Sequence, residues 1–280
     1  MNNKICIITG ANSGVGKATA KQLAALDFHV VMVVRNEEKG RKALEEIKLE
    51  IGKNSLELMM CDFASQKSIH EFVKKFKEKY DRLDVLVNNH GVIPSKRFIT
   101  EDGIESAFAI NHLGYFLLTN LLLDMIKASS PARIINVCSG SYAAIRKIRL
   151  DDYNFEKRRY SWFKAYSETK LYNVMFTLDL ADQLKSVGVT VNTFTPGFTL
   201  TNLGQSLRSM RLVTKLRARK AATPDDAAKI AVYLATSKEM ENISGKYFMK
   251  MEMKEPTRIA KDKVLQEELW DLSEKLTKIK

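Results

Sequence analysis

The sequence is poor in cysteine, proline and glycine, which occur only 3, 5 and 13 times in 280 residues. Cys6, Cys61 and Cys138 are odd in number, lie in apolar segments and lack metal-ligand spacing, so they predict reduced core thiols and no metal site. The scattered prolines and glycines form no linker, and no internal repeat is visible. We therefore expect a single domain over residues 1–280.

Long hydrophobic runs are also missing. The longest, 30–34 and 115–118 among them, fall far below the roughly 18 residues that a membrane-spanning helix needs. An apolar strand at residues 5–8 follows the first residue so closely that it leaves no room for a signal peptide. These features predict a cytoplasmic protein.

Acidic residues are fewer than basic ones, and the formal net charge is +12 with a pI near 9.4. Such a surface favours anionic partners: a phosphorylated cofactor, acidic lipid headgroups or nucleic acid. The basic residues are spread along the chain without a recognised nucleic-acid-binding motif, so we expect no nucleic-acid partner. A solvated basic surface is the simplest interpretation of the charge.

Strand and helix patterns alternate along the whole chain. Apolar, β-branched runs predict strands at 4–9, 28–34, 56–61, 83–88, 133–138, 189–194 and 245–250. Amphipathic runs predict helices at 16–26, 39–51, 66–79, 104–128, 163–185 and 223–237, and a charged helix closes the chain. Continuous apolar strands alternating with helices indicate an α/β fold, a doubly wound Rossmann-type parallel sheet with helices on both faces.

A glycine-rich loop follows the first predicted strand and reads TGxxxGxG over residues 9–16. Glycines there allow a tight turn and let the backbone approach a pyrophosphate at the start of the next helix. Ligands of such sheets bind at the carboxyl ends of the strands. The loop therefore predicts a dinucleotide site, with these candidate residues: Gly10, Asn12, Ser13, Gly14, Val15 and Gly16.

The end of the second strand bears on which dinucleotide binds. An acid there would bond the ribose 2′-hydroxyl of NAD(H), but the strand ends in Val34 and Arg35. Arg35 suits a 2′-phosphate, and Lys17 offers a second positive charge. The pattern favours NADP(H) over NAD(H), with Glu37 or Glu38 folding back to a ribose as the alternative.

Tyr166 and Lys170 are four residues apart in a predicted helix and so share one face. An ammonium about 4 Å from the phenol, at an effective dielectric of about 20, favours phenolate by roughly 4 kcal/mol. We therefore predict that Lys170 lowers the pKa of Tyr166 towards neutrality, making it a general acid/base.

Other motifs complete a familiar order. Asn88-Asn89-His90-Gly91 follows the fourth strand, Asn111 lies in the long helix, Ser139 follows the fifth strand, and residues 196–201 read PGxxxT. With TGxxxGxG and YxxxK, this set resembles the short-chain dehydrogenase/reductase family over nearly the whole chain. The helix segment 111–119 (NHLGYFLLT) and the C-terminal segment are most similar to the retinol dehydrogenase group.

The resemblance implies a role for each catalytic candidate. Tyr166 would exchange the proton with the substrate oxygen, Lys170 would hold the nicotinamide ribose, and Ser139 would hydrogen-bond the substrate oxygen. Asn111 would anchor a water in the proton relay. Further cofactor contacts would come from Asp62, Phe63, Asn88, Gly91, Pro196, Gly197, Thr199 and Thr201, together with Tyr166 and Lys170.

Two departures from the family pattern stand out. Cys138 occupies a position where serine is common, so the catalytic hydroxyl is assigned to Ser139, with Ser141 as the alternative. His90 replaces a usual alanine beside the cofactor groove, where it would alter cofactor affinity. Homodimers and homotetramers are common in the family, and nothing in this sequence selects one.

The resemblance implies an NADP(H)-dependent oxidoreductase of a hydrophobic carbonyl/alcohol pair, retinoid-, steroid- or lipid-aldehyde-like. The alternative is a noncatalytic NADP(H)-binding sensor or scaffold. A substrate-covering segment is expected at about 199–222 and a C-terminal extension at about 252–280. Within the former, Asn202–Ala222 has apolar residues at helical spacing with basic residues between them. It is read either as a lid helix packed on the core or as a peripheral contact with an anionic membrane.

Overall fold

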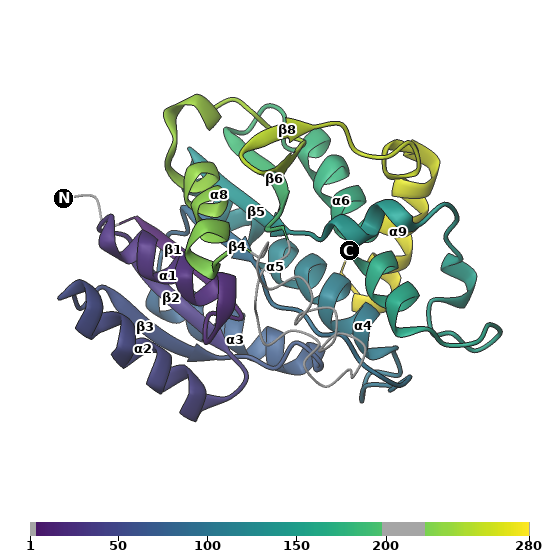
Figure 1. The fold of residues 1–280 in the computed structure, drawn as a ribbon, viewed down its shortest axis with the longest axis horizontal. Helices are drawn as coiled ribbons and strands as arrows, with labels where there is room; N and C mark the ends of the chain where they lie inside the picture. Colours follow the sequence, from purple (N-terminus) through teal and green to yellow (C-terminus); the bar gives the residue numbers. More distant parts are fainter. Residues whose placement is uncertain (1–3, 198–221, 280) are drawn as a thin grey trace.

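The computed structural model describes residues 4–197 and 222–279. Their strands form one sheet of eight, in the order β3-β2-β1-β4-β5-β6-β7-β8 (Figure 1). The strands are β1 (Ile5–Thr9), β2 (His29–Val34), β3 (Leu56–Met60), β4 (Val85–Asn88), β5 (Ala132–Val137), β6 (Val189–Thr195), β7 (Lys246–Met249) and β8 (Glu252–Lys254).

All neighbouring strands pair in parallel except β7 and β8. The chain runs outwards from β1 to β3, then returns to place β4 on the other side of β1. The strand order therefore reverses between β1 and β4, and the carboxyl ends of the strands at such a reversal are the usual ligand position in doubly wound sheets. The predicted fold class is confirmed.

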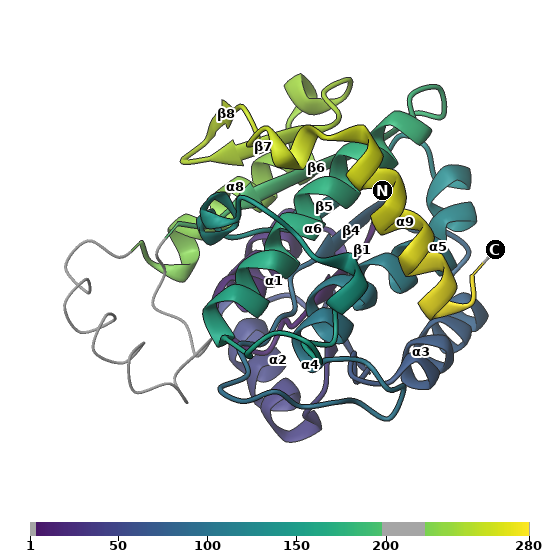
Figure 2. The same cartoon turned by 90° about the vertical axis from the view of Figure 1, so that its right-hand side faces the viewer.

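Helices cover both faces of the sheet. Apolar side chains of α1 (Gly14–Ala25), α2 (Glu37–Ile51) and α8 (Pro224–Thr236) pack with one face. Helices α3 (Gln66–Lys79), α5 (Gly114–Ala128) and α6 (Trp162–Gln183) cover the other face (Figures 1 and 2). Their apolar side chains pack in the core on that side. Short turns of helix lie at η2 (Gly140–Ala144), η3 (Leu150–Asp152), η5 (Lys238–Met240) and η6 (Ile259–Lys261).

The C-terminal helix α9 (Lys263–Thr277) lies outside this framework, across α5 and α6 (Figure 2). Its Trp270 ring meets Phe116 of α5 at 4.9 Å and Phe176 of α6 at 5.8 Å between ring centroids. The carbonyl of Leu276 accepts a hydrogen bond from Gln66 of α3 at 3.1 Å. The C-terminal extension therefore completes the core on that face.

The long helix predicted at 104–128 is interrupted. It consists of α4 (Ser106–Phe108), a π-helical turn η1 (Ala109–Leu113) and α5. Its length and composition would allow it to cross a membrane, but 83% of its most apolar window is buried inside the protein. It is therefore the core helix of the fold, as the short apolar runs of the sequence predict.

The strand β8 is absent from the sequence-based prediction. Lys250 and Met251 form a two-residue hairpin with φ of 54° and 65°, which turns the chain back from β7 into β8. Such turns are usually signalled by Asn-Gly or Asp-Gly, and Lys-Met carries no such signal. The predicted reduced core thiols are confirmed, since all three cysteines are free and buried.

Candidate active site

The predicted catalytic residues meet at the carboxyl edge of the sheet. Ser139 lies two residues after the end of β5 and caps η2, while Tyr166 and Lys170 lie one turn apart in α6. Helix α6 packs against β5, β6 and η2, which brings its second turn to the end of β5. The sequence spacing of Tyr166 and Lys170 therefore becomes a shared position beside Ser139.

Tyr166 and Ser139 lie close enough together for the Ser139 side chain to act on the pKa of the Tyr166 phenol, which it lowers. Ser141, the alternative hydroxyl, donates to Ser139 Oγ at 3.2 Å. The Lys170 ammonium donates to the Val137 carbonyl at 3.1 Å and lies 5.8 Å from the centroid of the Tyr166 ring. The assignment of the catalytic hydroxyl to Ser139 stays a prediction.

The predicted lowering of the Tyr166 pKa is wrong for the chain without a bound cofactor. Burial raises the pKa of Tyr166 to about 12, although the hydrogen bond from Ser139 opposes the rise. The same burial lowers the pKa of Lys170 to about 8. Both shifts favour the neutral form, because loss of water penalises a phenolate and an ammonium alike. For both residues, loss of water on burial is the largest cause of the pKa shift, and the attraction between the two charges does not offset it.

Asn111 lies within the π-turn, and its side chain is bonded to protein on both sides. Its Oδ1 accepts from the Val92 backbone N–H at 2.7 Å, and its Nδ2 donates to the Val92 carbonyl at 3.0 Å. The Nδ2 also donates to Thr169 Oγ1 at 3.2 Å. Thr169, which the sequence-based prediction did not include among the site residues, thus contributes a contact to Asn111. The role of Asn111 in anchoring a water stays a prediction.

A buried chain of polar residues supports this corner, and sequence reasoning missed most of it. Asn88 Nδ2 donates to Asn136 Oδ1 at 2.9 Å, and Asn136 Nδ2 donates to Thr177 Oγ1 at 2.9 Å. Asn173 Nδ2 donates to the Asn111 carbonyl at 2.9 Å. Asn173 and Thr177 follow Tyr166 and Lys170 by seven residues each, which places them along the same stripe of α6. That polar stripe is the signal that could have identified them.

The glycine loop fits a bound pyrophosphate. A Cβ at Gly16 would lie 2.4 Å from Asn89 Nδ2 and 2.5 Å from the Gly10 carbonyl oxygen, so only glycine fits there. Helix α1 has no side-chain cap bond and no acid in its first turn. No side chain of the cap or first turn therefore neutralises the positive N-terminal end of α1, which is the condition for binding a phosphate there. The nicotinamide dinucleotide that this fold implies is compatible with these residues.

The loop after β4 holds the glycine loop in place. Asn89 Nδ2 donates to the Thr9 carbonyl at 2.8 Å, and its backbone N–H donates to Thr9 Oγ1 at 2.9 Å. Asn88 is fully buried and points into the polar chain, so its side chain supports the groove from behind. Gly91 faces Asn111 and Lys170, since a Cβ there would lie 3.3 Å from Asn111 Oδ1. Asn89 is therefore the residue of this motif that sequence reasoning undervalued.

The remaining cofactor candidates that the structure describes follow the carboxyl ends of β3 and β6. Asp62 follows β3, where its Oδ1 accepts from the Ala64 N–H at 3.0 Å, and Phe63 stacks on the His90 ring at 3.5 Å. Pro196 and Gly197 follow β6. Thr199, Thr201 and the whole segment Asn202–Ala222 lie outside the described residues apart from Ala222.

Arg35 is exposed immediately after β2. The two acids that sequence reasoning weighed against it follow in α2, and Glu37 pairs with Arg41 at 2.5 Å. Lys17 does not join Arg35, because its ammonium ion-pairs with Glu46 of α2. The predicted second positive charge is thus taken up elsewhere, and Arg35 remains the candidate for recognising a ribose phosphate.

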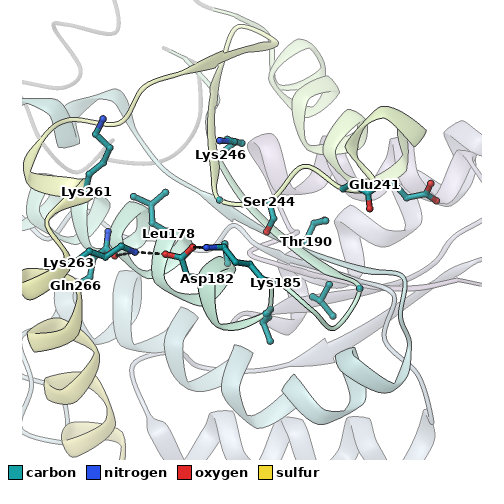
Figure 3. A pocket seen from close by; sticks show the side chains of 16 residues that line it. Leu178, Asp182, Lys185, Thr190, Glu241, Ser244, Lys246, Lys261, Lys263 and Gln266 are labelled. Carbon is teal, nitrogen blue, oxygen red and sulfur yellow. Dashed lines mark hydrogen bonds and ion pairs between the residues drawn. The ribbon is translucent and has the colours of Figure 1, made fainter.

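A pocket of about 630 Å³ lies at the opposite edge of the sheet (Figure 3). It is bounded by the end of α6, the starts of β6 and β7, and the start of α9. Two of its lysines already pair with Asp182, Lys263 at 2.5 Å and Lys185 at 2.7 Å. The predicted catalytic residues lie at the carboxyl ends of the strands and do not line this pocket.

His112 is packed inside the protein. It is buried, with Nε2 3.0 Å from Ser273 Oγ of α9 and Nδ1 3.4 Å from Asn173 Oδ1. Across the part of the chain that the structure describes, no group of three potential metal ligands occurs.

The fold and the site together define a doubly wound dinucleotide-binding protein with a serine–tyrosine–lysine centre. The chain matches the short chain dehydrogenase family over residues 4–150 and 154–212. It is 40% identical to human retinol dehydrogenase 13 over 279 residues, covering 98% of this chain and 84% of that protein. The chain therefore belongs to the short-chain dehydrogenase family and is an oxidoreductase of alcohol and carbonyl groups.

Two further comparisons agree. Human polyprenol dehydrogenase is 36% identical over 283 residues, covering 98% of this chain and 85% of that protein. A crystal structure from Beutenbergia cavernae, described as an NAD(P)-dependent gluconate 5-dehydrogenase with bound NADP, has a TM-score of 0.70 and 25% identity. That match covers 88% of this chain and 94% of the other. The resemblance to the retinol dehydrogenase group is confirmed.

The raised pKa of Tyr166 can be tested by titrating tyrosinate absorbance in the cofactor-free protein. Wild type and Tyr166→Phe should give the same curve up to about pH 10, because burial keeps Tyr166 protonated. Circular dichroism at each pH would verify that the protein stays folded. An extra tyrosinate near neutral pH, present in wild type and lost in Tyr166→Phe, would restore the original prediction.

Proposed function

We propose that this protein transfers a hydride between NADP(H) and a hydrophobic carbonyl/alcohol substrate, with Tyr166 as general acid/base. The observation that carries the proposal is the meeting of Ser139, Tyr166 and Lys170 at the carboxyl edge of the sheet, where the Val137 carbonyl holds Lys170. The glycine loop stands at the same edge after β1, so a dinucleotide and a substrate oxygen would meet there.

In the reducing direction, the neutral phenol of Tyr166 donates its proton to the carbonyl oxygen. The bound cofactor supplies the hydride. Ser139 hydrogen-bonds the same oxygen, where negative charge develops, and Ser141 orients Ser139 through the 3.2 Å bond between their hydroxyls. Lys170 is held by the Val137 carbonyl within reach of the groove beside Tyr166. A neutral tyrosine is the protonation state that reduction needs at its start.

The surroundings of Tyr166 suit a lipophilic substrate. Tyr166 packs with Ile93 and with the partly buried Trp162, and Phe163 beside them is 44% exposed. Apolar and aromatic walls next to a single polar centre are typical of sites for hydrophobic ligands. Two relatives are named for retinol and polyprenol, which are both lipophilic alcohols. We therefore propose a long-chain or isoprenoid-like aldehyde or ketone as the substrate class.

The first experiment is NADPH oxidation across a panel of lipophilic aldehydes and ketones, retinal included. Tyr166→Phe removes the proton donor, so turnover should fall by at least about 100-fold while NADPH binding persists. Tyr153→Phe serves as a control outside the catalytic set. If wild type binds NADPH tightly but turns over nothing in the panel, the noncatalytic sensor becomes the better hypothesis.

The proposed preference for NADP(H) rests on Arg35, which stands exposed at the end of β2. Arg35→Ala should raise the Kd for NADPH about 10- to 100-fold, the worth of charge-assisted bonds to a phosphate, and leave the Kd for NADH unchanged. Arg41→Ala is the matched control, because Arg41 is a nearby arginine of α2 whose guanidinium already pairs with Glu37 of that helix. Tighter binding of NADH than NADPH by wild type would reverse the assignment.

We also propose a peripheral membrane contact through Asn202–Ala222, which rests on sequence alone. Its arginines and lysines, with the net charge of +12, favour an anionic surface. The protein should cosediment with phosphatidylserine vesicles at low salt and be released at high salt. Arg211→Glu with Lys215→Glu should abolish that binding without changing NADPH affinity. Absence of cosedimentation at low salt would leave the lid-helix interpretation.

A homodimer or homotetramer stays a further part of the proposal.

A further inference from the structure

His90 connects two parts of the site that lie on different elements. The residue is 6% exposed, in the loop after β4, and its imidazole is hydrogen-bonded at both nitrogens. Nδ1 lies 2.8 Å from Thr9 Oγ1, at the end of β1 where the glycine loop begins. Nε2 lies 2.8 Å from the Ile110 carbonyl oxygen, in the π-turn beside Asn111.

The partners of the ring fix its hydrogen atoms. A carbonyl oxygen can only accept, so Nε2 carries a proton and donates to Ile110. Burial lowers the pKa of His90 to about 3, and the nearby Lys170 charge acts in the same direction. The ring is therefore neutral, and Nδ1 is an acceptor for the Thr9 hydroxyl at 2.8 Å, with the Val87 carbonyl at 3.3 Å as the other acceptor for the same proton.

The bond to Ile110 uses an acceptor that the π-turn makes available. In a regular α-helix, the N–H of Gly114 would pair with the Ile110 carbonyl four residues earlier. Here the Gly114 N–H bonds instead to the Ala109 carbonyl, five residues earlier. His90 Nε2 donates to the Ile110 carbonyl, which the Gly114 N–H would use in a regular α-helix. A buried carbonyl without a donor would be costly, so this bond stabilises the turn.

Three further neighbours hold the imidazole ring in one position. A Cβ at Gly114 would lie 2.8 Å from His90 Nε2, so the absence of a side chain there admits the imidazole. Phe63 stacks on one face of the ring with an interplanar angle of 8°. Tyr115 meets it edge-on at 4.8 Å, and the Tyr115 hydroxyl donates to the His90 carbonyl at 2.9 Å. The ring therefore cannot rotate away from Ile110 without disrupting its neighbours.

We propose that His90 is a positioning residue for the reaction, holding the π-turn in the register that points Asn111 at Val92 and α6. It touches no reacting atom. Its action passes through the Ile110 carbonyl to the adjacent Asn111, whose side chain is fixed by Val92 and Thr169. The kinetic part of this inference rests on the proposed function above, whereas the structural part does not.

Three substitutions separate the hydrogen bond from packing. His90→Ala removes the ring, His90→Leu refills the volume without a donor, and His90→Gln restores an N–H near the place of Nε2. With a substrate of the panel, Ala and Leu should each lower kcat about tenfold, the worth of one buried hydrogen bond. Their Kd for NADPH should change less than about threefold, because Thr9 keeps its backbone donors from Asn89 and His90. Gln should recover most of kcat.

Amide hydrogen exchange supplies a readout independent of turnover. Peptides spanning the π-turn should exchange faster in His90→Ala and His90→Leu than in wild type, and His90→Gln should restore protection. Peptides from α2, remote from the turn, should be unchanged in all variants. This measurement decides the inference even if wild type turns over no substrate, the outcome that would refute the proposed function.

Two results would overturn the inference. The first is unchanged exchange of the π-turn in His90→Ala. The second is equal behaviour of His90→Leu and wild type in both assays, which would make the ring a packing element only. A fall in kcat that matches a fall in NADPH affinity would assign the effect to the Thr9 contact and also reject the proposed route through Ile110.

Discussion

The active corner depends on a buried chain of amide and hydroxyl groups that ties β4, β5 and α6 to the π-turn. Asn88, Asn136 and Thr177 are linked side chain to side chain, and the Thr177 hydroxyl donates to the Asn173 carbonyl at 2.7 Å. Asn173 then donates to the backbone of Asn111. Buried polar groups are costly unless paired, so each link restricts its neighbours to one arrangement. This network of buried hydrogen bonds therefore positions the candidate catalytic side chains.

The fold was predictable because its signals are local and repeated. Continuous apolar runs, glycines after the first strand and amphipathic helices indicated a doubly wound sheet, and element limits agreed within a few residues. Two features escaped. The hairpin at Lys250-Met251 uses residues without turn preference, and the π-turn at Ala109–Leu113 has the composition of an ordinary helix. Both depend on tertiary contacts that a single sequence does not display.

At the site, residue identity was easier to predict than electrostatics. The spacing of Tyr166 and Lys170 placed them together, but the same burial that creates the site shifts the pKa of each towards its neutral form. The sign of a shift depends on how much water is lost as well as on the neighbouring charge. A sequence can indicate which charged residue lies nearby, but it says little about how much water the group loses on burial. His90 shows the same limit, since its two partners lie 81 and 20 residues away in the chain.

The three cysteines have a practical consequence. Each thiol is buried, and burial raises the pKa of Cys61 and Cys138 to about 12. Since the thiolate is the reactive form, alkylating reagents and mild oxidants act on these sulfurs only when the surrounding structure opens. Cys6 lies in β1, Cys61 directly after β3, and Cys138 between β5 and Ser139. The rate at which each thiol becomes accessible therefore reports, without any added label, how often each region of the sheet comes apart.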